Sequence, residues 1–133
     1  MNIVYPAIVV AYPPSTNRLW SYSKKGVYRT KSYMDWLDEA LYAIKWQHET
    51  IELLCGVSIW ANPGDKRKRD IDNIVKPLLD LLEHAKIVKN DNQFIELGVR
   101  WDYQIPPRKV SILITGLVHD AMEHQPSTEM IAS

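Results

Sequence analysis

Acidic side chains gather in the stretch RDIDNIVKPLLD at residues 69–80. Asp70 and Asp72 stand one residue apart, directly after the basic run KRKR at 66–69. In an extended segment, side chains two residues apart point the same way. Carboxylates are hard oxygen ligands that Mg²⁺ takes together with water and phosphate oxygens. The spacing is therefore compatible with a metal site that acts on a phosphate.

The same two aspartates have a purely structural interpretation. Carboxylates at the start of a helix cap free N–H groups and interact favourably with the helix dipole. The neighbouring basic run would then neutralise Asp70 and Asp72. An EF-hand loop is excluded, because its sixth and twelfth positions would be Val75 and Leu81 instead of Gly and Glu. Spacing alone does not decide between capping and metal binding.

Lys76 lies one helical turn beyond Asp72. Its ammonium group could reach the same phosphate and stabilise negative charge in a transition state. Asn73 lies beside the aspartates as a supporting polar residue. The structural alternative pairs Lys76 with Asp80 at i+4, and Asp80 is then a helix-surface residue that flanks the site.

Length and composition suit one domain of 133 residues with 46% hydrophobic content. The net charge is zero, but residues 1–31 carry five Lys or Arg and no acid. Such basic patches suit a polyanionic partner, although they also occur as solvated faces. No membrane-spanning run or signal peptide is recognised, and the single cysteine, Cys55, is interpreted as a core residue in a reducing cytoplasm. We expect a domain over 1–118 and a flexible tail over 119–133.

Hydrophobic periodicity predicts the elements that position these residues. The predicted order is β-α-β-α-β-β, an α+β single domain with two main helices on one face of a mixed sheet. Strands are expected at 7–11, 53–61, 95–102 and 109–115, helices at 33–48 and 74–86, and a hairpin around Lys25-Gly26.

Three local details are expected within these elements. Ser32 and Asp35 fit a capping box at the start of the first helix. Ile95, Leu97, Val99 and Trp101 alternate with Glu96, Gly98, Arg100 and Asp102, which predicts a half-buried strand with the apolar residues facing the core. Pro77 falls in the first turn of the second helix, where its missing N–H is tolerated.

The pattern Asp70-x-Asp72-Asn73-x-x-Lys76-x-x-Leu79-Asp80-x-Leu82, followed by Asp91 in VKNDNQ, resembles the RusA family of Holliday junction resolvases. The segments PPSTN at 13–17 and VYRT before the first helix are also similar to that family. The resemblance runs from about residue 9 to 116. It implies a homodimeric, Mg²⁺-dependent endonuclease that nicks four-way DNA junctions symmetrically. Mn²⁺ is expected to substitute, and no organic cofactor or membrane is implied.

Position by position, the resemblance implies that Asp70, Asp72 and Asp91 are the metal-binding catalytic carboxylates and that Lys76 is the essential lysine. The chain departs from the family at Asn90, where the family often has an acid. Contacts with DNA phosphates are expected from the basic segments. These contacts comprise Arg18, Lys24, Lys25, Arg29, Lys66, Arg67, Lys68 and Arg69.

The chain path gives a separate test of this site. A helix over 74–85 is roughly 18 Å long, and six extended residues span at most about 20 Å. Asp91 can therefore rejoin Asp70 and Asp72 only if residues 86–91 run straight back, extended and antiparallel to the helix.

Other functions remain open at this stage. The chain could be a metal-dependent nuclease for other branched or flapped DNA, with the same site and a different dimer. It could be a non-catalytic DNA-binding module whose aspartates are caps, or an interaction protein that uses an exposed strand edge. Paired nicks in a two-fold symmetric junction favour a C2 homodimer with two active sites.

Overall fold

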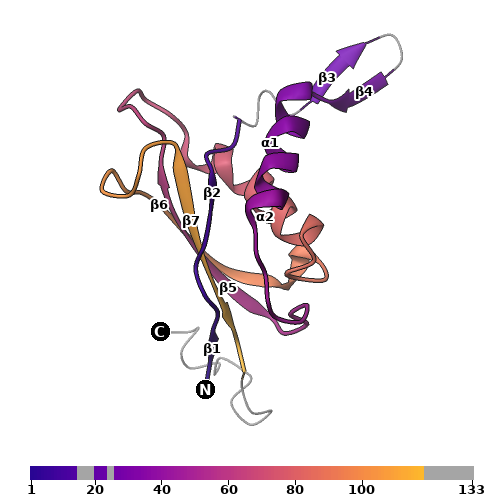
Figure 1. Ribbon diagram of the computed structural model, residues 1–133, viewed down its shortest axis with the longest axis vertical. Coiled ribbons are helices and arrows are strands. Elements are labelled where there is room, and N and C mark those ends of the chain that lie inside the picture. Colours follow the sequence, from indigo (N-terminus) through magenta and orange to yellow (C-terminus); the bar gives the residue numbers. More distant parts are fainter. Residues whose placement is uncertain (15–19, 24–25, 119–133) are drawn as a thin grey trace, which may run out of the picture.

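A computed structural model of the chain describes residues 1–14, 20–23 and 26–118, with residues 20–23 and 26–29 described by their backbone alone. Figure 1 shows a mixed sheet with two helices on one face, which confirms the predicted α+β class. The five strands of the sheet are β1 (Ile3–Val4), β2 (Ile8–Ala11), β5 (Cys55–Asn62), β6 (Phe94–Trp101) and β7 (Lys109–Gly116).

The central strand of the sheet is β7. It pairs antiparallel with β5 on one edge and with β1 and β2 on the other. Strand β6 pairs parallel with β5 and forms the far edge of the described sheet. The helices are α1 (Lys31–Ala43) and α2 (Val75–His84). A separate antiparallel pair, β3 (Trp20–Ser23) with β4 (Gly26–Arg29), confirms the predicted hairpin and lies beyond the start of α1 (Figure 1).

The core lies between the sheet and the two helices. Alternate residues of β5 and β7 meet one face of each helix there, as the hydrophobic pattern predicts. Cys55 is completely buried, and this burial raises the pKa of its thiol. The buried side chains include Tyr33, Trp36, Leu37, Ala40, Val57, Ile59, Leu78, Leu81, Leu82, Val110, Ile112 and Ile114.

The start of α1 differs from the prediction. Thr30 is the N-cap, and its side-chain oxygen accepts the N–H of Tyr33 at 3.3 Å. Lys31 is already helical, so Ser32 cannot take the extended cap conformation. Asp35 instead accepts a hydrogen bond from Lys31 at 2.7 Å. The predicted capping box is therefore wrong, and the helix ends at Ala43, before the predicted residue 48.

The inward-facing pattern predicted for β6 is wrong at its first half. Ile95 and Leu97 are 57% and 52% exposed. The register shifts between Cys55 and Gly56, so that Phe94 pairs with Cys55 and Ile95 has no partner residue. Such a bulge interrupts the alternation of side chains. Leu97 lies beyond it on an edge strand, where few groups cover a side chain.

The crossover between β5 and β6 carries the candidate site. Parallel strands need such a long connection. The chain leaves β5, passes through a basic loop at 63–70, η2 (Ile71–Ile74) and α2, and returns through η3 (Asp91–Gln93) into β6. None of the helices in the described ranges is long and apolar enough to cross a membrane.

The return path of the crossover is only partly as predicted. Pro77 lies in the first turn of α2, as expected. After α2 the chain turns through Lys86, whose φ is 58°, and the N–H groups of Ile87 and Val88 donate to Leu82 at 3.0 and 3.4 Å. Residues 86–91 are therefore not a continuous extended segment, but they do bring Asp91 back beside α2.

Candidate active site

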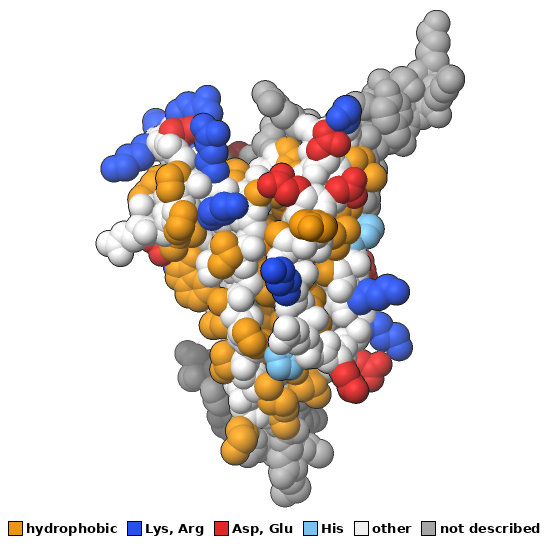
Figure 2. Space-filling view, viewed as in Figure 1, with side chains coloured by type: hydrophobic (Ala, Val, Ile, Leu, Met, Phe, Trp, Pro, Cys, Tyr) orange, Lys and Arg blue, Asp and Glu red, His pale blue; other side chains and the backbone are white. Residues whose placement is uncertain are grey.

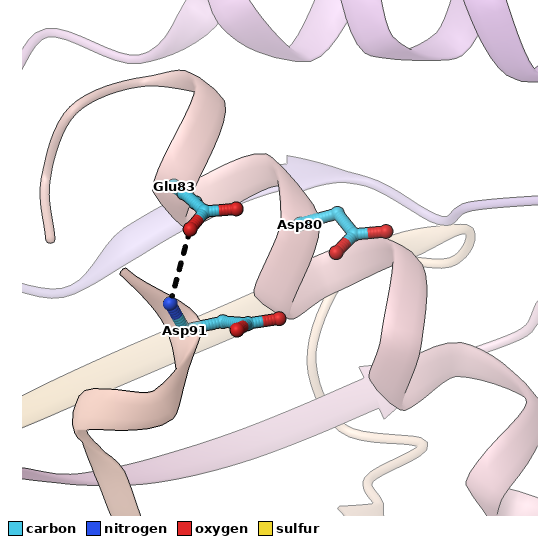
Figure 3. Close-up of side chains that lie close together, drawn as sticks. All are labelled: Asp80, Glu83 and Asp91. Atoms are coloured by element: carbon cyan, nitrogen blue, oxygen red, sulfur yellow. Dashed lines mark hydrogen bonds between the residues drawn. The ribbon is translucent and has the colours of Figure 1, made fainter. Parts of the chain in front are cut away.

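Three carboxylates lie together on the crossover. The ligand oxygens of Asp80, Glu83 and Asp91 are all within 4.8 Å of one another, and the three residues are half-buried. Figure 3 shows the side chains of Asp80 and Glu83 on α2 and that of Asp91 on η3, pointing toward one another. We call this set the carboxylate cluster. Asp80, which the sequence placed only beside the site, belongs to it.

Local structure explains why these side chains meet. Residues three apart in a helix share a face, so Asp80 and Glu83 point the same way while Leu78 and Leu81 face the core. The backbone N–H of Asp91 donates to Glu83 Oε1 at 3.2 Å, drawn as a dashed line in Figure 3. This bond fixes the start of η3 against α2.

Lys76 is the cation beside the cluster. Its ammonium group lies 3.0 Å from Asp80 Oδ1 and 3.3 Å from Asp91 Oδ2. The hydrogen bond to Asp80 raises the pKa of Lys76, burial opposes this rise, and Asp91 adds to it. The i+4 contact with Asp80 considered from the sequence is therefore present, together with a second contact to Asp91. One ammonium group offsets part of the charge of three carboxylates.

Gln93 holds the loop that carries Asp91. Its side chain is buried, and its Nε2 donates to the carbonyl oxygens of Ile51 and Leu53 at 2.8 and 2.9 Å. Its Oε1 accepts the N–H groups of Lys89 and Asn90 at 2.9 and 2.8 Å. Every hydrogen-bonding position of the amide is therefore used. The sequence reasoning missed this residue, although the Asn90-x-x-Gln93 spacing is that of a capping box.

Asp70 and Asp72 lie at the other end of α2. Asp70 has the extended N-cap conformation of η2, but its carboxylate makes no capping hydrogen bond. Within the described residues, neither the Asp70 nor the Asp72 carboxylate takes part in a hydrogen bond or ion pair, and both residues are exposed. Capping therefore does not account for these carboxylates.

The predicted triad is not gathered into one tight set. Asp72 precedes Asp80 by eight residues, which is on the order of 12 Å along a helix. Among the described residues, the close group of three carboxylates contains Asp91 but neither Asp70 nor Asp72. The structure thus places Asp91 beside the C-terminal half of α2, where its N–H donates to Glu83 and its carboxylate contacts Lys76. The joint action of Asp70, Asp72 and Asp91 stays a prediction.

The basic loop is organised by a different acid. Asp65 accepts hydrogen bonds from Arg69 Nη1 and Nη2 at 2.6 and 2.9 Å, and from Arg67 N and Nε at 2.9 and 3.2 Å. The Arg69 guanidinium, with Arg67, holds the pKa of Asp65 well below its usual range. The arginines therefore neutralise Asp65, not Asp70 or Asp72.

Lys66 and Lys68 are the other basic residues of this loop. Figure 2 shows Lys and Arg side chains gathered at the upper left, where the loop after β5 lies in Figure 1. Lys66 lies 5.5 Å over the ring of Tyr103, and Lys68 is exposed. Of the other predicted DNA contacts, Arg18, Lys24 and Lys25 lie outside the described residues. Arg29 lies in β4, where only the backbone is described.

The donor set of the cluster fits a hard divalent cation. Three carboxylates supply oxygen ligands, and their half-buried positions limit the screening of their mutual repulsion. A basic loop for phosphates and two further exposed carboxylates lie on the same crossover. Fold and site together describe a small α+β protein whose crossover carries clustered carboxylates and basic side chains, a set of groups suited to phosphodiester chemistry.

Comparisons with known proteins identify the family. The family described as Endodeoxyribonuclease RusA matches residues 11–115. The chain is 32% identical over 112 residues to the crossover junction endodeoxyribonuclease rusA of Enterobacteria phage HK97, covering 82% of this chain and 92% of that protein. It is 31% identical over 86 residues to the crossover junction endodeoxyribonuclease RusA of Aquifex aeolicus (strain VF5), covering 63% and 68%. The chain belongs to the RusA family of endonucleases, as the resemblance indicated.

Substitution of Gln93 tests its structural role. We expect Gln93→Ala to lower the free energy of unfolding by about 2–3 kcal/mol, because buried N–H and C=O groups lose their partners. Chemical denaturation measures this change. Gln104→Ala, at an exposed position, is the control and should change stability by less than about 0.5 kcal/mol. Equal stability of the two variants would contradict the role of Gln93.

Metal titration distinguishes the two groups of carboxylates. We expect Asp80→Asn to weaken Mn²⁺ binding by about 10-fold or more, because the cluster loses one negative charge. Lys76→Met should tighten binding by about 3- to 10-fold, because the ammonium group no longer competes for Asp80 and Asp91. Isothermal titration calorimetry on the full chain measures both.

The control for this titration is Asp38→Asn, which removes an exposed acid from α1. Unchanged affinity in Asp80→Asn, together with a large loss in Asp70→Asn, would assign the first metal to Asp70 and Asp72 instead of the cluster.

Proposed function

We propose that this chain resolves four-way DNA junctions by paired, symmetric nicks in a reaction that requires Mg²⁺, with Mn²⁺ as a substitute. The observation that carries the proposal is the crossover itself, which bears the carboxylate cluster, Lys76, Asp70 with Asp72, and the basic loop. Membership of the RusA family and the names of both relatives support junction DNA as the substrate.

The residues have separable roles in this proposal. Asp80, Glu83 and Asp91 would hold a divalent cation, and Asp70 and Asp72 would offer further oxygen ligands close to bound DNA. Such a cation supplies neutralisation of charge at the phosphate and activation of water.

Other side chains bind and orient the phosphodiester. Lys76 places a positive charge beside the cluster, where it would stabilise the charge that develops on the phosphate. Exposed Arg67 and Lys68 would bind the DNA backbone, while Arg69 is held in place by Asp65. Asn73, whose backbone N–H donates to the Asp70 carbonyl oxygen at 3.1 Å, would support the ligand geometry.

The proposed assembly is a C2 homodimer in the cytoplasm, where DNA is accessible. A four-way junction has two equivalent strands to cut, so two sites related by the same two-fold axis match it. No organic cofactor is needed for hydrolysis. Residues 1–118 would form the catalytic domain, and residues 119–133 would be a separate tail outside the described part of the chain.

A substrate comparison tests the proposed activity. In Mg²⁺, we expect the purified chain to cut four-way junctions at least about 100-fold faster than linear duplex, three-way junctions or flaps. A supercoiled plasmid with an extruded cruciform should yield linear product directly, because two sites cut within one binding event. Gel electrophoresis of labelled products measures both. Faster cutting of flaps would favour a nuclease for other branched DNA.

Asparagine substitutions separate catalysis from binding. We expect Asp70→Asn and Asp91→Asn to reduce cleavage by at least about 100-fold, because each removes a negatively charged ligand. Junction binding in Ca²⁺ should be retained or tightened, because repulsion from phosphate falls. Asp38→Asn should behave like the unmodified chain. Undiminished cleavage by both variants would show that Asp70 and Asp91 are not catalytic, whereas no cleavage by the unmodified chain would favour a DNA-binding module with structural aspartates.

A further inference from the structure

A pocket lies beside the basic loop, between residues that the proposed chemistry uses and an aromatic pair, Tyr12 and Trp101, that it does not use. Its volume is about 670 Å³, and it is lined by Tyr12, Arg67, Arg69, Asp70, Asn73 and Trp101. These residues come from three parts of the chain: the segment after β2, the crossover, and the end of β6. The pocket therefore forms only when the sheet and the crossover are folded together.

One wall of the pocket is aromatic. The rings of Tyr12 and Trp101 are stacked, with centroids 6.5 Å apart and planes inclined by 27°. Both side chains are partly buried and pack against the core, so their positions are held from behind. Trp101 ends β6, and the following N–H, of Asp102, donates to Ala61 at 2.9 Å. A fixed π surface that still borders an open pocket is suited to stacking with a planar ring.

The opposite wall is positively charged and held in position. Arg67 and Arg69 both bind Asp65. The Arg67 side chain is nevertheless 80% exposed. Arg69, with a side chain 21% exposed, is fixed between Asp65 and the pocket. The same loop lines one pocket with the aromatic pair. Burial raises the pKa of Tyr12, and the Arg69 guanidinium opposes that rise. A phosphate at Arg67 and Lys68 would place its base toward the aromatic pair.

Asp70 connects this pocket to the proposed chemistry. It is exposed on the pocket wall, and its carboxylate makes no capping bond. A nucleotide bound in the pocket would therefore lie next to a predicted catalytic carboxylate. Bases inside a duplex are stacked and paired, so only an unpaired or opened base could enter. At the crossover of a junction the continuous stacking of a duplex is interrupted, so a base there can be opened at a lower cost.

We propose that this pocket binds one unpaired nucleotide at the crossover of the junction, with its base stacked on Tyr12 and Trp101 and its phosphate on Arg67 and Lys68. This proposal rests on the proposed function, since it needs branched DNA as the ligand. In this proposal, a stacking contact selects the position at which the junction is cut. The basic loop alone would bind any phosphate backbone.

The test combines protein variants with altered DNA. Four-way junctions carry a single abasic nucleotide, which keeps the phosphate and removes the base, at each position near the crossover. Affinity is measured in Ca²⁺ by fluorescence anisotropy with the unmodified chain and with Trp101→Leu. We expect one abasic position to weaken binding to the unmodified chain by about 10- to 100-fold. Trp101→Leu should bind the intact junction as weakly as the unmodified chain binds that abasic junction. The abasic nucleotide should not weaken the binding of Trp101→Leu further.

Two additional variants control for folding. Trp101→Phe keeps an aromatic face and should restore most of the affinity and the sensitivity to the abasic position. Trp60→Leu removes a tryptophan that packs under Arg100 at 4.5 Å, outside this pocket, and should behave like the unmodified chain. Tyr12→Leu repeats the test from the other ring if Trp101→Leu does not fold. Circular dichroism verifies the fold of each variant.

The outcomes separate this inference from the proposed function. If the unmodified chain cuts junctions in Mg²⁺ but no abasic position weakens its binding, the pocket does not bind a base and the proposed function stands. An equal abasic effect in the unmodified chain, in Trp101→Leu and in Tyr12→Leu overturns the pocket in the same way. If the unmodified chain cuts no four-way junction, the proposed function fails and this inference fails with it.

Discussion

The parallel pairing of β5 and β6 determines where the functional residues lie. Parallel neighbours cannot be joined by a tight turn, so the chain must leave one end of the sheet and return to the other. Helix α2 makes that return, and it carries Lys76, Asp80 and Glu83 on the face that does not enter the core. The loops at its two ends then place Asp70 and Asp91 on either side of the helix. A tight hairpin after β5 would leave out α2 and its two loops, so these side chains would not lie on one connection.

Each loop of the crossover is held by one polar side chain with several hydrogen bonds. Asp65 binds two arginines and a backbone N–H in the loop before η2. Gln93 binds four backbone groups around η3. Irregular segments have no ladder of backbone hydrogen bonds, so a side chain must satisfy those groups instead. Both residues fix functional neighbours without carrying out the chemistry themselves.

The sequence predicted the fold class well because that class depends on local patterns. The strand predicted at 109–115 and the helix predicted at 74–86 correspond to β7 and α2, and both were confirmed. The exposure of Ile95 was not predictable, because it depends on a register shift against β5 that no local pattern records. Asp80 was undervalued for a similar reason. Its role follows from the return of Asp91, which is a contact across eleven residues of sequence.

The two groups of carboxylates differ in exposure, and this difference determines how each responds to a cation. Asp70 and Asp72 are exposed, so water screens their repulsion and keeps them hydrated. The side chains of Asp80 and Asp91 are only 17% and 31% exposed, so their repulsion is screened less and a cation relieves more of it. Bound DNA changes this balance. In the proposed complex it would exclude water from Asp70 and add phosphate oxygens beside it, so that cation and DNA would stabilise each other there. The cluster can therefore gain from a cation before DNA arrives, whereas Asp70 and Asp72 gain most from both together.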